Sequence, residues 1–131
     1  MPDLKLMTRS GPPPALPQTP YTVRRVNDAT IAPAIKQRFG SEAKPPGQVV
    51  SLQLMHGGQA VGFAQLGLGQ VAQIAWMHVD RAHWGTGGAD HLAIASLHEI
   101  HRAGYGDVHA LVDPSNAASV KLAKRHGGSW A

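Results

Sequence analysis

The sequence predicts an α/β protein with one mixed sheet that carries helices on both faces. Three consecutive strand-like runs between residues 48 and 79 predict an antiparallel meander. A glycine-rich turn, an amphipathic helix and a further strand-like run at 107–113 follow it. Because strands joined through a helical crossover lie parallel in a sheet, the meander and this unit together make the sheet mixed.

Turn and cap signals delimit the elements and give the order β-α-βββ-α-β-α. Asn27 or Asp28 can cap a helix that Gly40 ends, and the pair Gly57-Gly58 is typical of a tight hairpin. The expected ranges are 21–26, 48–55, 60–69, 71–79 and 107–113 for the strands, and 27–40, 89–104 and 116–127 for the helices.

The first 20 residues hold six of the ten prolines and show no hydrophobic periodicity. We therefore expect a disordered or polyproline-like segment at 1–20. The rest of the chain, 21–131, is long enough for one folded domain with a single core.

The composition excludes several classes of function. The chain has no cysteine, which rules out disulfides, thiolate catalysis and cysteine-ligated zinc. Its formal net charge of +4 suits a small polyanionic ligand, but there is no basic run of the kind that binds nucleic acid. Neither an apolar run of about 20 residues nor a signal peptide is visible. We therefore expect a cytoplasmic protein that does not bind membranes.

The stretch "VDRAHWGTGGADHL" places Gly85, Gly87 and Gly88 between a strand and a helix. Backbone amides in such a turn, together with the helix dipole, can hold an anion such as a phosphate. Alternatively, the glycines make only a tight turn for packing. A Walker A loop is absent, and a dinucleotide fingerprint is a weak match because Asp90 stands where its third glycine belongs.

Residues 21 to 128 resemble the GNAT superfamily of acetyl-CoA-dependent N-acetyltransferases. The stretch from Val79 through the glycine turn is similar to the family's strand, Arg/Gln-Gly-x-Gly-x-Gly/Ala turn and helix, with Trp84 in place of Arg or Gln. A second family signature, Asn-x-x-Ser-x-x-Leu-x-x-Lys/Arg-x-Gly, is matched by Asn116, Ser119, Leu122, Arg125 and Gly127.

The resemblance implies acetyl-CoA as cosubstrate and a set of residues that bind it. The main-chain groups of Met77 and Val79 would bind the pantetheine arm and polarise the thioester carbonyl. Lys121, Lys124 and Arg125 lie on the last helix, as cations near the ligand or as solvated charges. The residues that the resemblance assigns to the cofactor are Met77, Val79, Trp84, Gly85, Thr86, Gly87, Gly88, Ala89, Asn116 and Ser119.

The sequence departs from the family at both positions that carry proton transfer. Ala123 stands where many members have a tyrosine acid, and Gln73 is the nearest match to a glutamate base. His78 and His83 flank the expected acetyl site and are candidate bases, because histidine exchanges protons near neutral pH. Each could instead be a packed or solvated histidine.

Three hypotheses for the function follow. The first is an N-acetyltransferase that acts on a primary amine of a small molecule or peptide. The second is a catalytically impaired GNAT-fold module that binds acetyl-CoA or CoA without turnover. The third is a nucleotide-binding α/β domain unrelated to acyl transfer, which the antiparallel meander argues against. The sequence does not identify the acceptor.

Two further expectations concern the partner and metals. The chain ends at "GGSWA", without the family's usual last strands, so we expect a homodimer that covers the open sheet edge, with Trp130 near the contact. His91, His98 and His101 share one helix face, but we expect no metal there, because a solvated polar face explains them better.

Overall fold

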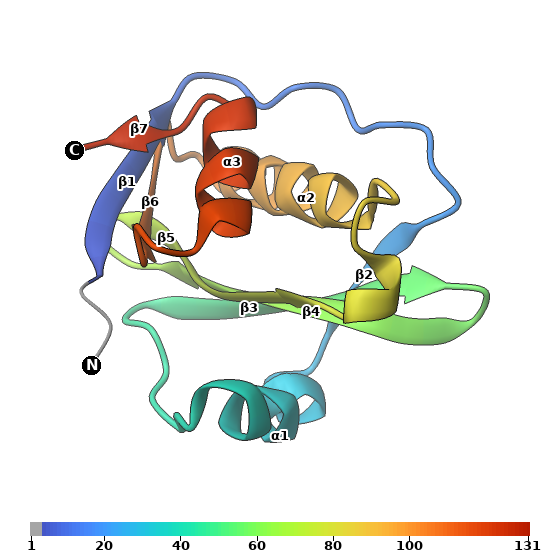
Figure 1. The fold of residues 1–131 in the computed structure, drawn as a ribbon. Helices are drawn as coiled ribbons and strands as arrows, with labels where there is room; N and C mark the ends of the chain where they lie inside the picture. The colour runs from blue at the N-terminus through green and yellow to red at the C-terminus, as the bar shows by residue number, and fades with distance from the viewer. Residues whose placement is uncertain (1–3) are drawn as a thin grey trace.

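The computed structural model describes residues 4–131 as one sheet flanked by three α-helices (Figure 1). A single 3-10 turn, η1, precedes the second helix. The strands are β1 (Lys5–Ser10), β2 (Thr22–Val26), β3 (Gln48–His56), β4 (Gln59–Leu68), β5 (Ala72–Val79), β6 (Asp107–Val112) and β7 (Ser129–Trp130); the helical elements are α1 (Asp28–Phe39), η1 (Arg81–His83), α2 (Gly88–Arg102) and α3 (Ala117–Arg125).

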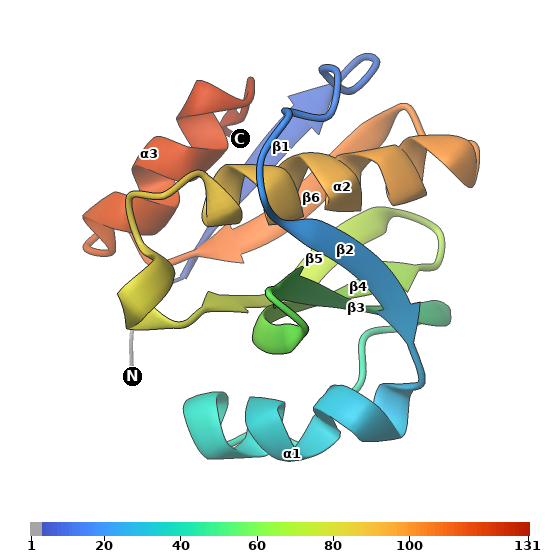
Figure 2. The same cartoon turned by 90° about the vertical axis from the view of Figure 1, so that its right-hand side faces the viewer.

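The sheet is mixed, as the sequence predicts, and has the strand order β2-β3-β4-β5-β6-β1-β7. Strands β2 to β5 pair antiparallel in succession, whereas β5 and β6 pair parallel through the α2 crossover. Helix α1 lies on one face of the sheet, and α2 and α3 lie on the other (Figures 1 and 2). The α/β fold class with helices on both faces is confirmed.

Two groups of buried side chains hold these layers together. The larger group fills the space between the sheet and α2, where Leu54, Leu66, Leu92 and Ile100 are fully buried. The smaller group packs α1 against the opposite face of the sheet and consists of Ile31, Ile35 and Phe63. The central strands are therefore covered on both faces, which explains their nearly continuous apolar sequence.

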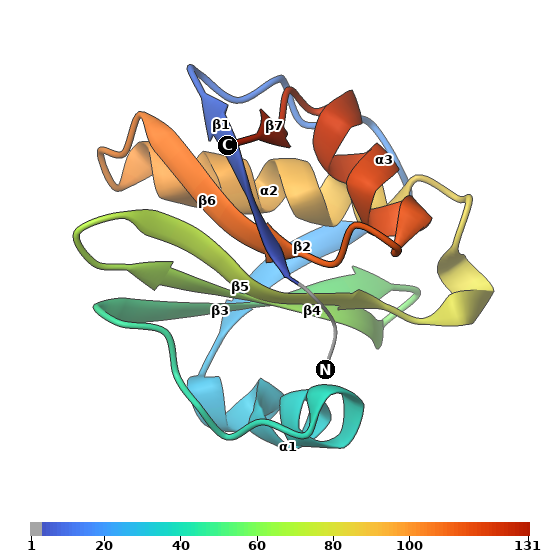
Figure 3. The same ribbon diagram turned by 60° about the vertical axis from the view of Figure 1, so that its left-hand side comes forward.

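The expectation of a disordered segment at 1–20 is wrong for residues 5–10. These residues form β1, which pairs antiparallel with β6 from Lys5↔Val112 to Ser10↔Asp107 (Figure 3). Only Met7 of this strand is buried, so the alternation that identifies a strand from sequence is almost absent. The strand forms because β6 offers an unpaired edge; residues 1–3 lie outside the described part of the chain.

Residues 11–20 have no regular secondary structure, but hydrogen bonds hold them over α2 (Figure 1). Gly11 donates its amide to the carbonyl of Gly106 at 3.1 Å. The side chain of His98 bonds the carbonyl of Pro14, and that of His91 bonds the Thr19 hydroxyl, both at 2.7 Å. The segment thus connects β1 to β2 along a defined path.

The sheet edge at β6 is not open, contrary to the expectation that led to the homodimer. β1 occupies it, and the two-residue strand β7 adds to the far side of β1 through Met7↔Trp130. Trp130 is 36 % exposed. The N-terminal segment therefore completes the sheet where the sequence analysis expected C-terminal strands to be missing.

Candidate functional site

The parallel strands β5 and β6 separate after a short contact. They pair only at Ala72↔Val108 and Gln73↔His109, although β5 continues to Val79. The register between β4 and β5 shifts at Gln65/Leu66, which leaves one extra residue on β5, and such a bulge bends and twists its strand. The end of β5, including Met77, therefore pairs with β4 alone.

The glycine turn leads from this strand end into α2. Gly85 and Gly87 have φ values of 73° and 89°, and Gly87 is the N-cap of α2. Within the described residues, no backbone carbonyl accepts a hydrogen bond from the amides of residues 85–90; from Gly87 onward this is expected, because the first amides of a helix have no partner within it. These donors and the positive end of the helix dipole together form an anion-binding surface.

Two of the three glycines of the turn, Gly85 and Gly88, serve different purposes. A Cβ atom on Gly85 would meet no atom within 4 Å, so its positive φ is the only demand that the fold makes there. A Cβ on Gly88 would lie 3.1 Å from the Tyr21 ring and 3.3 Å from Leu54. Gly88 is therefore a packing glycine, whereas Gly85 leaves the turn open to a ligand.

Trp84 links the turn back to β5. Its indole N–H donates to the main-chain carbonyl of Val79 at 2.7 Å, and the guanidinium of Arg81 lies 5.7 Å from the ring centroid. The side chain is nevertheless 57 % exposed. The Val79 carbonyl thus already has a partner, and an aromatic face remains accessible beside the free amides.

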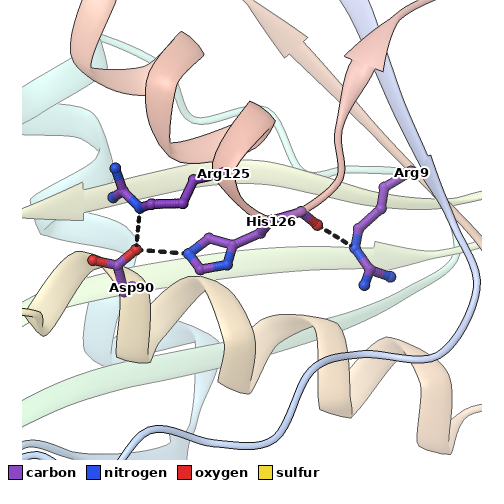
Figure 4. A network of polar contacts seen from close by, with 4 residues as sticks. All are labelled: Arg9, Asp90, Arg125 and His126. Atoms are coloured by element: carbon purple, nitrogen blue, oxygen red, sulfur yellow. Dashed lines mark hydrogen bonds and ion pairs between the residues drawn. The ribbon is translucent and has the colours of Figure 1, made fainter.

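Asp90 places a negative charge in the first turn of α2, but the side chains of Arg125 and His126 at the end of α3 contact it (Figure 4). Its carboxylate accepts hydrogen bonds from Arg125 at 2.8 Å and from His126 at 2.6 Å. Partial burial alone would raise the pKa of Asp90; these bonds and charges outweigh it and lower the pKa. Arg9 of β1 donates in turn to the His126 carbonyl.

His78 lies on the opposite side of the sheet and contacts a carboxylate. Its Nε2 is 3.2 Å from Asp80 Oδ1, its ring packs 5.6 Å from that of Phe63, and its side chain is 19 % exposed. His78 and Asp80 line a cavity of about 170 Å³ between α1 and the strands β3, β4 and β5, with Arg38 at its rim 3.9 Å from Asp80. This arrangement can orient an imidazole toward a small guest molecule.

A family model described as "Acetyltransferase (GNAT) family" matches residues 15–128. The chain belongs to the GNAT acetyltransferase family. This GNAT chain is also similar in fold to solved structures of low sequence identity. A GCN5-related N-acetyltransferase from Sphaerobacter thermophilus is 21% identical with a TM-score of 0.75, over 98% of this chain and 48% of that one.

Two further structures show the same GNAT fold. A GCN5-related N-acetyltransferase from Kribbella flavida is 15% identical with a TM-score of 0.70, over 97% of this chain and 54% of that one. An aminoglycoside N-acetyltransferase in complex with CoA is 18% identical with a TM-score of 0.67, over 81% of this chain and 90% of that one. The chain thus spans about half the length of the first two. No curated protein matches the sequence.

The second GNAT signature lies on α3. Asn116 caps this helix by accepting a hydrogen bond from the Ser119 amide at 3.2 Å. The nine-residue helix places Asn116 about 14 Å from the end that contacts Asp90. Lys121 and Lys124 are exposed on α3. Asn116 and Ser119 are therefore at the end of α3 that follows β6, where β6 has separated from β5. They are not at the end of α3 that contacts the first turn of α2.

The second candidate base, His83, is placed differently from His78. Its Nδ1 is 2.8 Å from the Tyr21 hydroxyl, which is also 2.6 Å from Thr86 Oγ1. The ring of His56, at the end of β3, lies 4.9 Å from Tyr21 and 5.2 Å from His83. The structure thus separates the two histidines, with His83 under the glycine turn and His78 in the cavity.

Sequence reasoning missed Tyr21, Asp80 and His126 as parts of the site. Asp80 follows His78 by two residues, which on an extended strand puts both side chains on the same face, so the alternation could have indicated the pair. Tyr21 and His126 gave no such signal, because Tyr21 bonds residues 62 and 65 positions away in the chain and His126 bonds one that is 36 positions away.

The sequence analysis expected the three histidines of α2 to form one solvated face, and this expectation is wrong. His91 is 9% exposed and bonds Thr19, and burial lowers its pKa. His98 bonds Pro14, and His101 is exposed. Among residues 4–131 no group of three metal-ligating side chains comes together, and none of the helices described there is long and apolar enough to cross a membrane.

Proposed function

We propose that the protein transfers an acetyl group from acetyl-CoA to a primary amine. The observation that carries this proposal is the junction of two features: the free amides of residues 85–90, and the end of β5 that β6 leaves without a partner. The first suits the pyrophosphate of coenzyme A. The second leaves main-chain groups, near Met77, for the amide-rich pantetheine arm.

The remaining predicted cofactor residues support the same arrangement. Gly85 leaves space above the turn, and the exposed ring of Trp84 lies beside it. Asp90, which would repel a phosphate, is neutralised by α3. Asn116 and Ser119 come after the separated strand end, where an extended arm running along β5 would pass. An aminoglycoside acetyltransferase of the same fold was solved in complex with CoA, which supports coenzyme A as the ligand.

The acyl transfer needs a base that takes a proton from the acceptor amine. It also needs a group that stabilises the negative charge that develops on the thioester carbonyl oxygen. The neutral amine would attack the carbonyl carbon, the amine proton would pass to the base, and coenzyme A would leave as a thiolate that takes up a proton. We assign the base role to His78, because Asp80 can accept from its Nε2–H and leave Nδ1 with the lone pair. The 170 Å³ cavity suits an unbranched primary amine.

The hypothesis of a module that binds acetyl-CoA without turnover stands beside this proposal. Two residues favour it: Gln73 pairs with His109 inside the short β5–β6 ladder, and Ala123 offers no proton donor on α3. Cytoplasmic location and homodimerisation are further proposals, although the sheet edge that suggested the dimer is covered by β1.

Titration calorimetry and thiol release separate these hypotheses. We expect acetyl-CoA to bind with a Kd below about 1 mM, and free thiol to appear with at least one amine class among polyamines, aminoglycosides, amino acids and peptides. Binding without turnover would support the module. No binding would contradict both.

Substitution of the His78–Asp80 pair tests the base assignment. We expect His78→Gln and Asp80→Asn to lower kcat by about 100-fold. The affinity for acetyl-CoA should stay unchanged, because both side chains line the cavity on the α1 side of the sheet, whereas the glycine turn leads into α2 on the other side (Figure 1). His101→Gln on the exposed face of α2 is the control. A kcat equal to that of the wild type in His78→Gln would remove the residue from the mechanism.

A further inference from the structure

The hydroxyl groups beneath the glycine turn form a closed set of contacts. Thr86 donates its hydroxyl proton to the His83 carbonyl. Tyr21 Oη is 2.6 Å from Thr86 Oγ1 and 2.8 Å from His83 Nδ1. Tyr21 immediately precedes β2, His83 belongs to η1, and Thr86 lies in the turn itself.

The positions of the protons in this set follow from counting donors. A threonine hydroxyl has one proton, and the His83 carbonyl takes it. The contact between Tyr21 and Thr86 therefore requires Tyr21 to donate to Thr86. The tyrosine oxygen is then left to accept, so the proton in the third contact lies on His83 Nδ1. In the neutral imidazole, Nε2 carries the lone pair.

Tyr21 is also the packing support of the turn. Its side chain is 3% exposed, and the ring edge lies where a Cβ on Gly88 would approach within 3.1 Å. Its amide donates to the Thr19 hydroxyl at 3.1 Å, which also bonds His91 of α2. The residue thus contacts the turn from below with its ring and its hydroxyl, and connects to α2 through Thr19.

We propose that Tyr21 is a positioning residue for the glycine turn. Its hydroxyl closes a directed ring of hydrogen bonds that runs from His83 Nδ1–H through Tyr21 and Thr86 to the His83 carbonyl. This ring fixes both the conformation of the turn and the Nδ1–H tautomer of His83. Tyr21 does not contact the ligand. It acts through Thr86 and Gly88, whose neighbouring amides are the donors of the anion-binding surface. The effect on acetyl-CoA rests on the proposed function, whereas the tautomer does not.

The first test is the nitrogen-15 spectrum of histidine-labelled protein at about pH 8.5, where imidazole groups are generally neutral. Protonated and unprotonated ring nitrogens differ in chemical shift, and His83→Gln assigns the signals. We expect Nδ1–H in the wild type, and a mixture of tautomers in Tyr21→Phe and in Thr86→Val. An Nε2–H tautomer in the wild type would overturn the proposal, as would an unchanged tautomer in both variants.

The second test compares the two tyrosines of the chain. Tyr105 also donates its hydroxyl in a hydrogen bond, to the carbonyl of Gly69 in the loop between β4 and β5. We expect Tyr21→Phe to raise the Kd of acetyl-CoA about fivefold, the loss of one hydrogen bond, with kcat nearly unchanged. Tyr21→Phe and Tyr105→Phe should lower the melting temperature by comparable amounts. Tyr105→Phe should leave the Kd as in the wild type.

The outcomes of the two tests are distinguishable. If wild-type protein shows the Nδ1–H tautomer but does not bind acetyl-CoA, the proposed function fails and the hydrogen-bond ring stands. If acetyl-CoA binds and Tyr21→Phe and Tyr105→Phe have equal affinities, Tyr21 is not a positioning residue. Gly88→Ala gives a second way to disturb the packing of Tyr21 against the turn. Gly106→Ala is its control, because a Cβ there meets nothing within 4 Å. We expect only Gly88→Ala to weaken the binding of acetyl-CoA.

Discussion

In the glycine turn, backbone conformation and available space determine which residue each position accepts, more than side-chain chemistry does. Gly85 has a positive φ and open space around its Cα, whereas Gly88 has a neighbouring ring that excludes a side chain. Both look alike in the sequence. The proposed anion-binding surface therefore depends on Gly85 and Gly87 and on the free amides that follow them, whereas Gly88 belongs to the packing of the core.

Gly85→Ala separates backbone strain from ligand binding. An alanine at positive φ costs about 1 kcal/mol of stability, and we expect the melting temperature to fall accordingly. We also expect the Kd of acetyl-CoA to rise about tenfold or more, because the turn must change its φ to relieve the strain and its amides then point elsewhere. Thermal unfolding and calorimetry on the same samples measure both effects.

The matched control is Gly40→Ala. Gly40 has a φ of 67°, against 73° at Gly85, and a Cβ there also meets nothing within 4 Å. It ends α1, away from the turn, and should show the same loss of stability with unchanged affinity for acetyl-CoA. Equal affinities in the two variants would mean that the turn does not bind the ligand.

At the scale of elements, the position of α3 against α2 depends on a small polar network. Asp90 of α2 accepts from Arg125 and His126, and Arg9 of β1 holds the His126 carbonyl (Figure 4). No side chain of α3 is fully buried, and its apolar residues Val120 and Leu122 are only half-buried, so the polar contacts add to a limited apolar packing. The network therefore fixes the helix that carries Asn116 and Ser119 relative to the turn.

Asp90→Asn should destabilise the protein in a pH-dependent manner. The lowered pKa of Asp90 means that the unfolded chain binds the proton more readily than the folded one, so lower pH favours unfolding. The contribution of Asp90 is complete above its reference pKa of 3.8 and is lost as the pH falls through the lower pKa of the folded state. At pH 7 we expect a loss of about 1 kcal/mol.

Urea unfolding at pH 7 and at acidic pH measures this effect. Glu99→Gln is the control. Among residues 4–131 the Glu99 carboxylate forms an ion pair only with Arg102 of its own helix, at 3.3 Å, and such a pair contributes about 0.3 kcal/mol. The difference between Asp90→Asn and wild type should shrink toward acidic pH. A constant difference at all pH values would contradict the electrostatic origin.

For the whole molecule, the N-terminal segment decides how the sheet is completed. β1 inserts between β6 and β7, and residues 11–20 then cross α2 to reach β2 (Figure 3). A strand from the start of the chain thereby covers an edge that would otherwise expose unpaired amides and carbonyls. The same segment brings Thr19 and Tyr21 to the underside of the glycine turn.

Met7→Ala tests this structural role of β1. Met7 is 2% exposed, and removing such a buried side chain costs about 2–5 kcal/mol. Leu16→Ala, in the same segment but 48% exposed, should change stability by less than about 0.5 kcal/mol. Equal stabilities of the two variants in urea unfolding would show that β1 does not contribute to the fold.

The sequence predicted those parts of the molecule whose signals are local. The meander and the amphipathic helix have clear periodicities, and the turn from Trp84 to Ala89 has glycines at fixed spacing. These features were sufficient for the fold class and for the family. Most of the residues expected to bind acetyl-CoA also belong to the two motifs, so the resemblance indicated which elements carry them.

The sequence by itself therefore determined the α/β class, the position of the glycine turn and the GNAT resemblance, because each depends on residues near one another in the chain. Only the tertiary structure decided that residues 5–10 complete the sheet, that His78 meets Asp80 beside a cavity, and that Tyr21 lies under the turn. β1 has a single buried residue and no alternation, and Tyr21 bonds residues more than 60 positions away. Such contacts form only when distant segments are brought together by the core, and no local pattern in the chain encodes them.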